Sequence, residues 1–374
     1  MKFYFVYSAG GGAGDWGGIN RIFTNNMPTY FKDNILIKFG DIFFNHRSSS
    51  SIIKKRLWNQ ISDAKSWLIS NTNDESLRDF HGMIMDVGTT KIVSFITSHD
   101  ADISNRQLIA RFNRIMEEEG IIEKYCEIIN NSEISNAVTF DIPELFKVRS
   151  NIGSVERNIF DDDNCRKELI DSCVNFANSI YHNTNRNPNN LMTIINIEWD
   201  RGDIEYYLSK LDYTPTKLAI GGAAFYRKTD MGEALAKLNS YLPLDQYQRV
   251  HFLGCGGLDK CAIIKEYVGN SSSFSADNTT PYNRGIDGST SGSSQSCYYD
   301  YATGKLIRIN PLTLDDILHK HRESEYIAHF SYEEMKEILH GILLHQSGQS
   351  SSYTYECRAR LIIHNFDVYR HRNE

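Results

Sequence analysis

The chain has 374 residues, and its 47 acidic and 40 basic side chains give a formal net charge of −7 at pH 7. Hydrophobic residues make up 41% of the sequence, a share that is typical of a globular protein and excludes a collagen-like or mostly disordered chain. The acidic balance excludes a protein that coats nucleic acid through bulk positive charge, so any contact with DNA or RNA must use a local patch.

Short apolar runs alternate along the chain with stretches of helical periodicity. Eight runs predict strands: Lys2–Tyr7, Ile35–Phe44, Gly82–Val87, Ala137–Asp141, Leu191–Trp199, Lys217–Gly221, Arg249–Gly254 and Ser273–Asp277. Helical periodicity is clearest at Ser51–Ser70, Ile103–Ile129 and Cys165–Tyr181. Because apolar strands that alternate with helices form a parallel sheet covered on both faces, we expect an α/β fold, a (β/α)8 TIM-like barrel, over residues 1–310.

The remaining segments are predicted from their composition. Residues 311–374 are expected to form a helical C-terminal elaboration packed on the barrel, with strong helical periodicity at Tyr332–Leu344. The Ser- and Gly-rich segment Gly285–Ser296 predicts a flexible loop. The glycine cluster Gly10–Gly18 lacks the Lys-Ser/Thr pair of a phosphate-binding loop, so we expect it to form a loop over the barrel mouth.

The cysteines bear on the compartment and on metal binding. All seven are scattered and none forms a CxxC pair, a pattern typical of reduced thiols in a cytoplasmic protein. No run of 18 apolar residues occurs, so we expect no contact with a membrane. A zinc site built from Cys297, Cys357 and His364 would lack the tight Cys pair of structural zinc sites, so we expect no metal and no other cofactor.

Several predicted strands end in an acidic residue or in glycine, namely at Asp86, Asp141, Glu198, Gly221-Gly222 and Asp277. Barrel enzymes place their active sites at these carboxyl ends, although Gly and Asp also begin loops and cap helices. Carboxylates that meet in one barrel mouth suit glycosidic chemistry: one attacks an anomeric carbon and a second acts as acid and base. A third can accept hydrogen bonds from the N–H groups of a base.

The densest positive cluster comprises Arg47, Lys54, Lys55 and Arg56, with no acidic residue between them. Such a cluster is usually a solvated helix face. It is also the strongest candidate in the sequence for contact with a nucleic-acid backbone.

Four segments resemble, in order, the motifs of the tRNA-guanine transglycosylase superfamily. Met83–Thr90 is similar to the family's DSGGF segment, and Val138–Glu144 is similar to its FDE strand end. Lys217–Ala223 is similar to its AIGG strand. Ser275–Pro281, followed by Arg284, is similar to its DCVxPTR segment. Ile362–Asn365 also resembles a His-Asn pair near the family's C-terminus.

The resemblance implies a role for each matching residue. Asp277 would be the nucleophile and Asp86 the general acid and base, while Asp141 would bind the edge of guanine. Gly221 and Gly222 would let the base approach the backbone. Two further residues, Glu198 and Arg284, would complete the substrate-binding set.

The sequence departs from the family at several positions. Val87 and Thr89 replace residues of the DSGG motif, the CxCxxC zinc cluster is missing, and no RNA-binding accessory domain is recognisable. This pattern is more similar to the DNA-guanine transglycosylases of 7-deazaguanine DNA-modification systems. It implies exchange of guanine in DNA for a 7-deazaguanine base through a covalent aspartyl-glycosyl intermediate. The short basic runs predict only a modest grip on phosphates, and extracting a paired base costs a few kcal/mol, so we also expect a partner protein that opens the duplex.

Three alternatives remain open at this point. The polymer could be tRNA. The chain could instead be a nucleoside or glycoside hydrolase that acts on a small substrate, or a non-catalytic barrel that senses a base.

Overall fold

The protein is described from a computed structural model. The structure describes residues 1–7, 28, 34–45, 47–72, 82–143, 145–150, 153–158, 163–185, 187–281, 285 and 296–373. The predictions for Gly10–Gly18, for Arg284 and for most of Gly285–Ser296 lie outside these residues.

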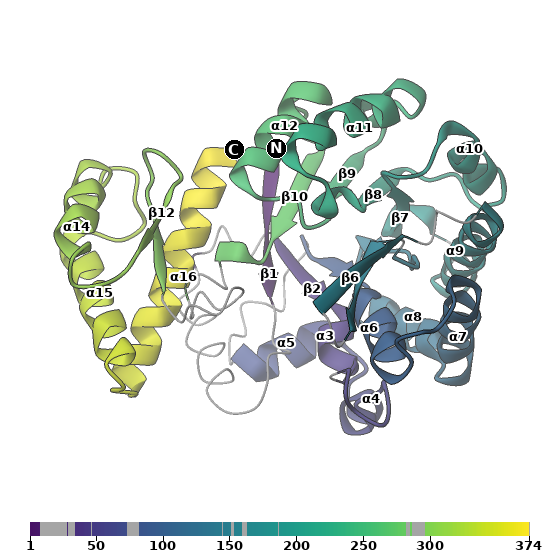
Figure 1. The fold of residues 1–374 in the computed structure, drawn as a ribbon, viewed down its shortest axis with the longest axis horizontal. Helices are drawn as coiled ribbons and strands as arrows, with labels where there is room; N and C mark the ends of the chain where they lie inside the picture. The colour runs from purple at the N-terminus through teal and green to yellow at the C-terminus, as the bar shows by residue number, and fades with distance from the viewer. Residues whose placement is uncertain are drawn as a thin grey trace.

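Eight parallel strands close into a barrel, which confirms the predicted (β/α)8 fold (Figure 1). The strands are, in order around the barrel, β1 (Lys2–Tyr7), β2 (Ile35–Lys38), β3 (Ile84–Asp86), β4 (Ala137–Val138), β7 (Leu191–Asn196), β8 (Lys217–Gly221), β9 (Arg249–Phe252) and β10 (Phe274–Asn278). β10 pairs with β1 and completes the ring.

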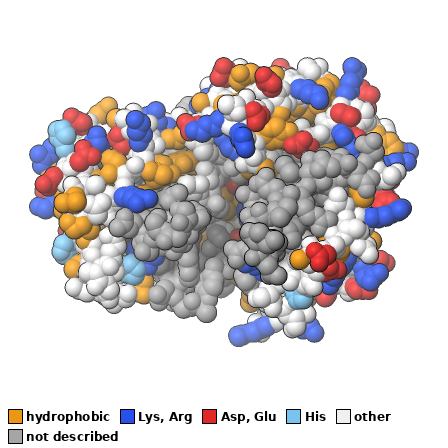
Figure 2. Space-filling model, viewed as in Figure 1, with side chains coloured by type: hydrophobic (Ala, Val, Ile, Leu, Met, Phe, Trp, Pro, Cys, Tyr) orange, Lys and Arg blue, Asp and Glu red, His pale blue; other side chains and the backbone are white. Residues whose placement is uncertain are grey.

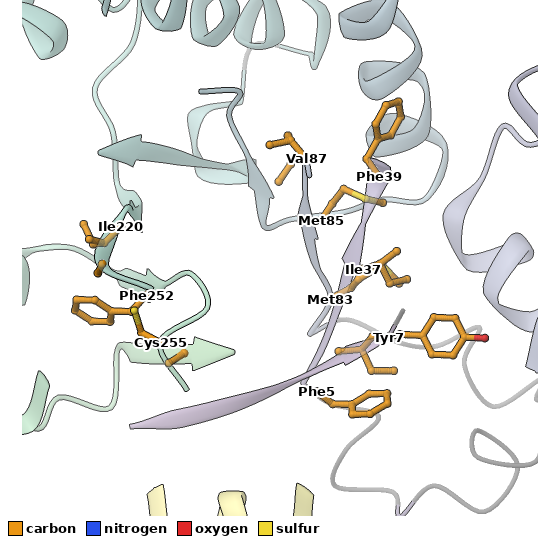
Figure 3. Close-up of a cluster of buried hydrophobic side chains, with 14 of the residues drawn as sticks. Phe5, Tyr7, Ile37, Phe39, Met83, Met85, Val87, Ile220, Phe252 and Cys255 are labelled. Atoms are coloured by element: carbon orange, nitrogen blue, oxygen red, sulfur yellow. The ribbon is translucent and has the colours of Figure 1, made fainter. Parts of the chain in front are cut away.

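Side chains alternate between two hydrophobic layers, as the two-residue period of a strand requires. Tyr4 and Val6 of β1 belong to the small cluster inside the barrel, together with residues from β2, β3, β4, β7 and β8. Phe5 and Tyr7 point the other way, toward the helices, and Figure 3 shows them beside Ile37 of β2. The strands are therefore buried on both faces, which is why they are apolar throughout.

Helices cover the outside of the barrel (Figure 1). They are α3 (Phe39–Phe43), α4 (Lys55–Gln60), α5 (Ala64–Thr72), α6 (Thr90–His99), α7 (Asn105–Glu118), α8 (Ile121–Asn131), α9 (Asp163–Asn183), α10 (Arg201–Ser209), α11 (Lys228–Tyr241) and α12 (Leu258–Tyr267). Short 3-10 helices lie at Pro188–Asn190, Ala223–Phe225 and Leu244–Gln246. Among the described residues, no helix combines the length and the apolar character needed to cross a membrane.

The C-terminal region is joined to the barrel by its last helix. It contains the strands β11 (Cys297–Tyr299) and β12 (Leu306–Arg308) and the helices α14 (Leu314–Glu323), α15 (Tyr332–Gln346) and α16 (Ser352–Asn373). The ring of Phe366 on α16 lies 4.5 Å from that of Phe5 and 5.9 Å from that of Phe3 on β1. In Figure 1, α16 lies between the barrel and the helices α14 and α15.

Some predicted elements are divided differently in the structure. β2 ends at Lys38, inside the predicted strand Ile35–Phe44, and helix α3 begins at Phe39. The backbone N–H of Gly40 donates to the carbonyl of Val87, 3.1 Å away, so the chain turns there to meet the end of β3. The predicted helix Ile103–Ile129 is two helices, because Gly120 adopts a left-handed conformation with φ +60° between them.

Two small sheets were not predicted, namely the pair β11 and β12 and a hairpin that follows β4. β5 (Leu145–Ser150) and β6 (Gly153–Asn158) form an antiparallel hairpin between β4 and α9. The alternation of apolar and charged residues in LFKVRS is the signal that could have indicated it.

Candidate active site

Asp277, the predicted nucleophile, lies on β10 with its side chain almost completely buried. Its Oδ1 atom is 3.1 Å from Nε2 of His251 on β9, and the backbone N–H of Gly254 donates to the same oxygen over 2.7 Å. Burial alone would raise the pKa of Asp277, but the His251 hydrogen bond and charge, the Lys38 charge and the Gly254 N–H together lower it. The carboxyl group is therefore held in its ionised form.

His251 is fixed on both of its ring nitrogens. Nδ1 lies 2.9 Å from the Ser275 hydroxyl oxygen, and the ring packs edge-on against Tyr4 at 5.4 Å. Because an ionised carboxylate only accepts hydrogen bonds, we assign a proton to Nε2, which donates it to Asp277. This histidine was missed by the sequence analysis, where it stood within an apolar run without any distinguishing motif.

Asp86, the predicted acid and base, lies at the end of β3 and its side chain is 13% exposed. Its Oδ2 atom is 3.8 Å from Nζ of Lys38. Burial raises the pKa of Asp86, Lys38 opposes this, and the nearby charge of Asp277 raises it further. The two carboxyls therefore shift in opposite directions, as expected for a proton donor beside an ionised group.

Lys38 is the second residue that the sequence analysis missed. It ends β2, directly beside Asp86 in the register of the sheet. Burial would lower the pKa of this ammonium group, but the charges of Asp86, Asp277 and Asp41 raise it. A permanent cation therefore stands among the carboxyls. A lysine that ends an apolar run was the available sequence signal.

Asp141, the predicted base-binding residue, follows β4 and is bound by Thr89. The Thr89 hydroxyl donates to Oδ1 of Asp141 over 2.8 Å. Burial raises the pKa of Asp141 to about 6, the Thr89 hydrogen bond opposes this and the charge of Asp86 adds to it. Thr89 stands at a position where the sequence departs from the resembled family, and here it orients the carboxylate.

The Gly221-Gly222 pair forms a wall beside Asp141. A Cβ atom on Gly221 would lie 3.7 Å from Oδ2 of Asp141, so the absent side chain leaves space in front of the carboxylate. Gly222 has φ +77°, and a Cβ there would lie 2.5 Å from the Asn196 side-chain oxygen. That oxygen accepts the backbone N–H of Glu198 over 3.0 Å. Asn196 thus supports both the glycine turn and Glu198.

These residues surround a cavity of about 180 Å3 at the carboxyl ends of the strands. The predicted residues that line it are Asp86, Asp141, Glu198, Gly221 and Gly222. Lys38, Thr89 and Asn196 line it as well. Asp277 does not: it is 3% exposed and lies directly behind Gly254, which does line the cavity.

The predicted nucleic-acid-binding residues Arg47, Lys54, Lys55 and Arg56 lie at or before α4 and do not line this cavity. The Lys54 ammonium donates to the backbone carbonyl of Asp41 over 2.7 Å. Burial, followed by the charge of Lys91, lowers the pKa of Lys54 to about 8. Lys55 and Arg56 are exposed. Arg284 lies outside the described residues.

The described part of the chain holds no group of three or more His, Cys, Asp or Glu side chains arranged to bind a metal ion. Two of the residues considered for zinc contact backbone carbonyls instead. His364 Nε2 lies 2.8 Å from the Tyr299 carbonyl oxygen, and the Cys357 thiol lies 3.7 Å from that of Glu337.

The fold and the site define a (β/α)8-barrel protein with a carboxylate-lined cavity at the mouth of the barrel and an ionised aspartate behind it. No protein-family model matches the chain, and no match is found among curated proteins.

Proposed function

We propose that the protein is a transglycosylase that exchanges guanine in DNA for a 7-deazaguanine base through a covalent aspartyl-glycosyl intermediate. One observation carries the proposal: Asp277 and Asp86 shift their pKa in opposite directions around Lys38, beside a cavity walled by Asp141 and Gly221. Double displacement at an anomeric carbon requires an ionised nucleophile and a second carboxyl that exchanges a proton with the base. The lowered pKa suits Asp277 to the first role, and the raised pKa suits Asp86 to the second.

In the first half-reaction the Asp277 carboxylate attacks C1′ of the target nucleotide. The bond from C1′ to guanine N9 breaks, its electron pair stays on the base, and the Asp86 carboxyl donates a proton to the departing guanine. Lys38 then lies beside a newly formed Asp86 carboxylate, whose negative charge it stabilises.

In the second half-reaction Asp86 takes the proton from the ring nitrogen of the incoming base. That nitrogen attacks C1′, the bond to Asp277 breaks, and Asp277 regains its carboxylate. Protons and electrons balance over the cycle, so the exchange needs no oxidant or reductant. His251 holds Asp277 in place as a positioning group, and the Gly254 N–H does so before the nucleotide binds.

Asp141 recognises the base in this proposal. An ionised carboxylate accepts hydrogen bonds from N1–H and from the exocyclic amino group of guanine, groups that a 7-deazaguanine retains. Thr89 occupies one lone pair of Oδ1, and the missing side chain of Gly221 leaves room in front of Oδ2. Glu198 lines the same cavity and is available to the rest of the substrate.

The burial of Asp277 sets a condition on the reaction. The Leu253–Gly254 backbone lies between the carboxylate and the cavity, so it must move when the nucleotide binds. The target nucleotide must also leave the helical stack, which costs a few kcal/mol in a duplex. This cost supports the proposal of a partner protein that opens the DNA.

We propose a cytoplasmic location, which the seven buried cysteines support because none of them forms a disulfide. DNA is proposed over tRNA because the sequence contains no CxCxxC motif like the zinc cluster of the resembled tRNA enzymes.

A labelling experiment tests the proposal. The protein is incubated with a radiolabelled 7-deazaguanine base and, in separate reactions, with single-stranded DNA, duplex DNA or bulk tRNA, with Asp277→Asn as the inactive control. We expect label in DNA, more in single strands than in duplex. Label in tRNA alone would indicate that the protein is a tRNA-guanine transglycosylase. Release of free guanine without incorporation would indicate a hydrolase.

A further inference from the structure

A second, larger cavity opens next to the first one. It has a volume of about 890 Å3 and lies among α11, α12, β12 and the C-terminal end of α16. Ala224 and Gly254 line both cavities, so the two are adjacent. We call the larger one the basic groove.

The charge of the basic groove is opposite to that of the whole chain. Its charged lining consists of five cations and a single acid: Lys228, Lys260, Lys265, Lys305, Arg372 and Asp259. The acid pairs with Lys228, and both of these side chains are largely exposed. Figure 2 shows Lys and Arg side chains gathered near the top of this face, where α12 approaches the end of α16. A chain of net charge −7 therefore carries a local positive patch beside its candidate active site.

Three of the cations are held in place by backbone carbonyl groups. Lys260 donates to the carbonyls of Ala223 and Ala224, and Lys265 donates to that of Asn373 over 2.6 Å. Arg372 donates to the carbonyls of residues 301 and 302 over 3.0 and 2.9 Å. Since a carbonyl oxygen carries no net charge, these contacts fix the cations without neutralising them.

We propose that the basic groove binds the phosphodiester backbone of the DNA strand that flanks the nucleotide held in the smaller cavity. This inference rests on the proposed function, because it places the rest of the strand once its base is in the cavity. Because Ala224 and Gly254 line both cavities, a strand whose reacting sugar lies at the smaller cavity would continue past these residues toward the cations. Phe225, which is 52% exposed and lines the smaller cavity, offers a ring for base stacking at the junction.

The structure thereby assigns phosphate binding to a different surface from the one that the sequence predicted. Arg47 and Lys54–Arg56 line neither the cavity nor the basic groove. Lys228 and Lys305 lie far from one another in the sequence, and only the fold makes both of them line the same groove.

The salt dependence of DNA binding tests the inference. We choose Lys228→Gln/Lys305→Gln, because both side chains are exposed and neither is bonded to a backbone carbonyl within the described residues. The control is Lys320→Gln/Lys336→Gln, which removes two exposed or half-exposed, acid-paired cations on α14 and α15. Binding of a fluorescein-labelled single-stranded DNA is measured by anisotropy over a range of salt concentrations.

Each lost phosphate contact on a single strand lowers the slope of log K against log salt by about 0.7, so the groove variant is expected to lose about 1.4. The control is expected to keep the slope of the unaltered protein. An unchanged slope in the groove variant would overturn the inference, and so would a loss found only in Lys55→Gln/Arg56→Gln. Equal competition by polyglutamate would overturn it too, because the site would then take any polyanion.

Base exchange measured on the same proteins separates this inference from the proposed function. A reduced salt dependence in the groove variant, with no base exchange by the unaltered protein, would support phosphate binding in the basic groove and contradict the transglycosylase activity. Base exchange by the unaltered protein, with an unchanged slope in the groove variant, would support the transglycosylase activity and contradict phosphate binding in the basic groove.

Discussion

At the scale of single residues, the site depends on how each carboxyl group is surrounded. Asp277 receives an N–H from His251 and another from Gly254. Around Asp86, burial and the charge of Asp277 outweigh the Lys38 ammonium group 3.8 Å away and a backbone N–H at Val87. Hydrogen bonds to a charged form stabilise it, and burial without enough of them favours the neutral form. The same residue type therefore serves as nucleophile at one strand end and as acid at another.

Asp277→Asn is expected to reduce base exchange by roughly 1000-fold or more, because an amide is a poor nucleophile. The fold should persist, since the amide oxygen can still accept from His251 and Gly254. Exchange rates and thermal unfolding measured on the same preparation check both statements. Exchange at the unaltered rate would remove Asp277 from the mechanism and make Asp86 the next candidate.

Asp141→Ala is expected to weaken base binding by about 30- to 1000-fold, which corresponds to roughly 2–4 kcal/mol for a buried carboxylate that accepts two N–H groups. Titration of the protein with the free base measures the loss. If binding stayed normal and only the thermal stability fell, Asp141 would be a structural residue.

Asp141→Asn has a separate, pH-dependent effect on stability. The pKa of Asp141 rises from 3.8 to about 6 on folding, so the folded state binds this proton more tightly than the unfolded chain. The contribution of Asp141 to the free energy of unfolding therefore falls as pH rises from about 4 to 6. Above that range the ionised Asp141 lowers the free energy of unfolding by up to about 3 kcal/mol. We expect Asp141→Asn to melt at a higher temperature than the unaltered protein at pH 8, with the difference gone near pH 4. A difference independent of pH would contradict this account.

At the scale of elements, the sequence was most informative about where the strands lie. It was least informative about which side chains of neighbouring strands come together. The eight strands were predictable because parallel strands with two buried faces are apolar throughout. Asp86, Asp141 and the Gly221-Gly222 pair were predictable because each ends such a run. The roles of Lys38 and His251 depend on which side chains the register brings together across neighbouring strands, and the sequence does not contain that register.

The glycine pair at the end of β8 offers a matched test. Gly221→Ala adds a methyl group at ordinary contact distances, 3.5 Å from Ile194 and 3.7 Å from Asp141. We expect it to keep the melting temperature and to lower base affinity, because the methyl group fills the space in front of Asp141.

Gly222→Ala should behave in the opposite way. Its φ of +77° and the Asn196 oxygen 2.5 Å from the added carbon predict a stability loss of about 1–3 kcal/mol. Unfolding curves and base titrations of the two variants compare the effects directly. Equal melting temperatures would show that the turn at Gly222 tolerates a side chain.

At the scale of the whole molecule, α16 connects the C-terminal region to the barrel. Phe366 of this helix is fully buried, and its ring packs against those of Phe3 and Phe5 on β1. We expect Phe366→Ala to cost about 3–5 kcal/mol and to lower the temperature of one cooperative transition. Two transitions in calorimetry, with only one of them shifted, would mean that the C-terminal region unfolds separately from the barrel.

The distribution of charge also acts at this scale. A net charge of −7 repels a polyanion over most of the surface, while the basic groove attracts it beside the cavity. The protein is thus expected to hold DNA at one place and to bind it more weakly as salt concentration rises.

The central claim is a covalent bond between Asp277 and DNA. The most direct measurement incubates the protein with single-stranded DNA in the absence of an incoming base, denatures the mixture, and digests the adduct for mass spectrometry. The account predicts a deoxyribose-linked peptide that contains Asp277, and no such peptide from Asp277→Asn. An adduct on the peptide that contains Asp86, or release of guanine with no adduct at all, would contradict it.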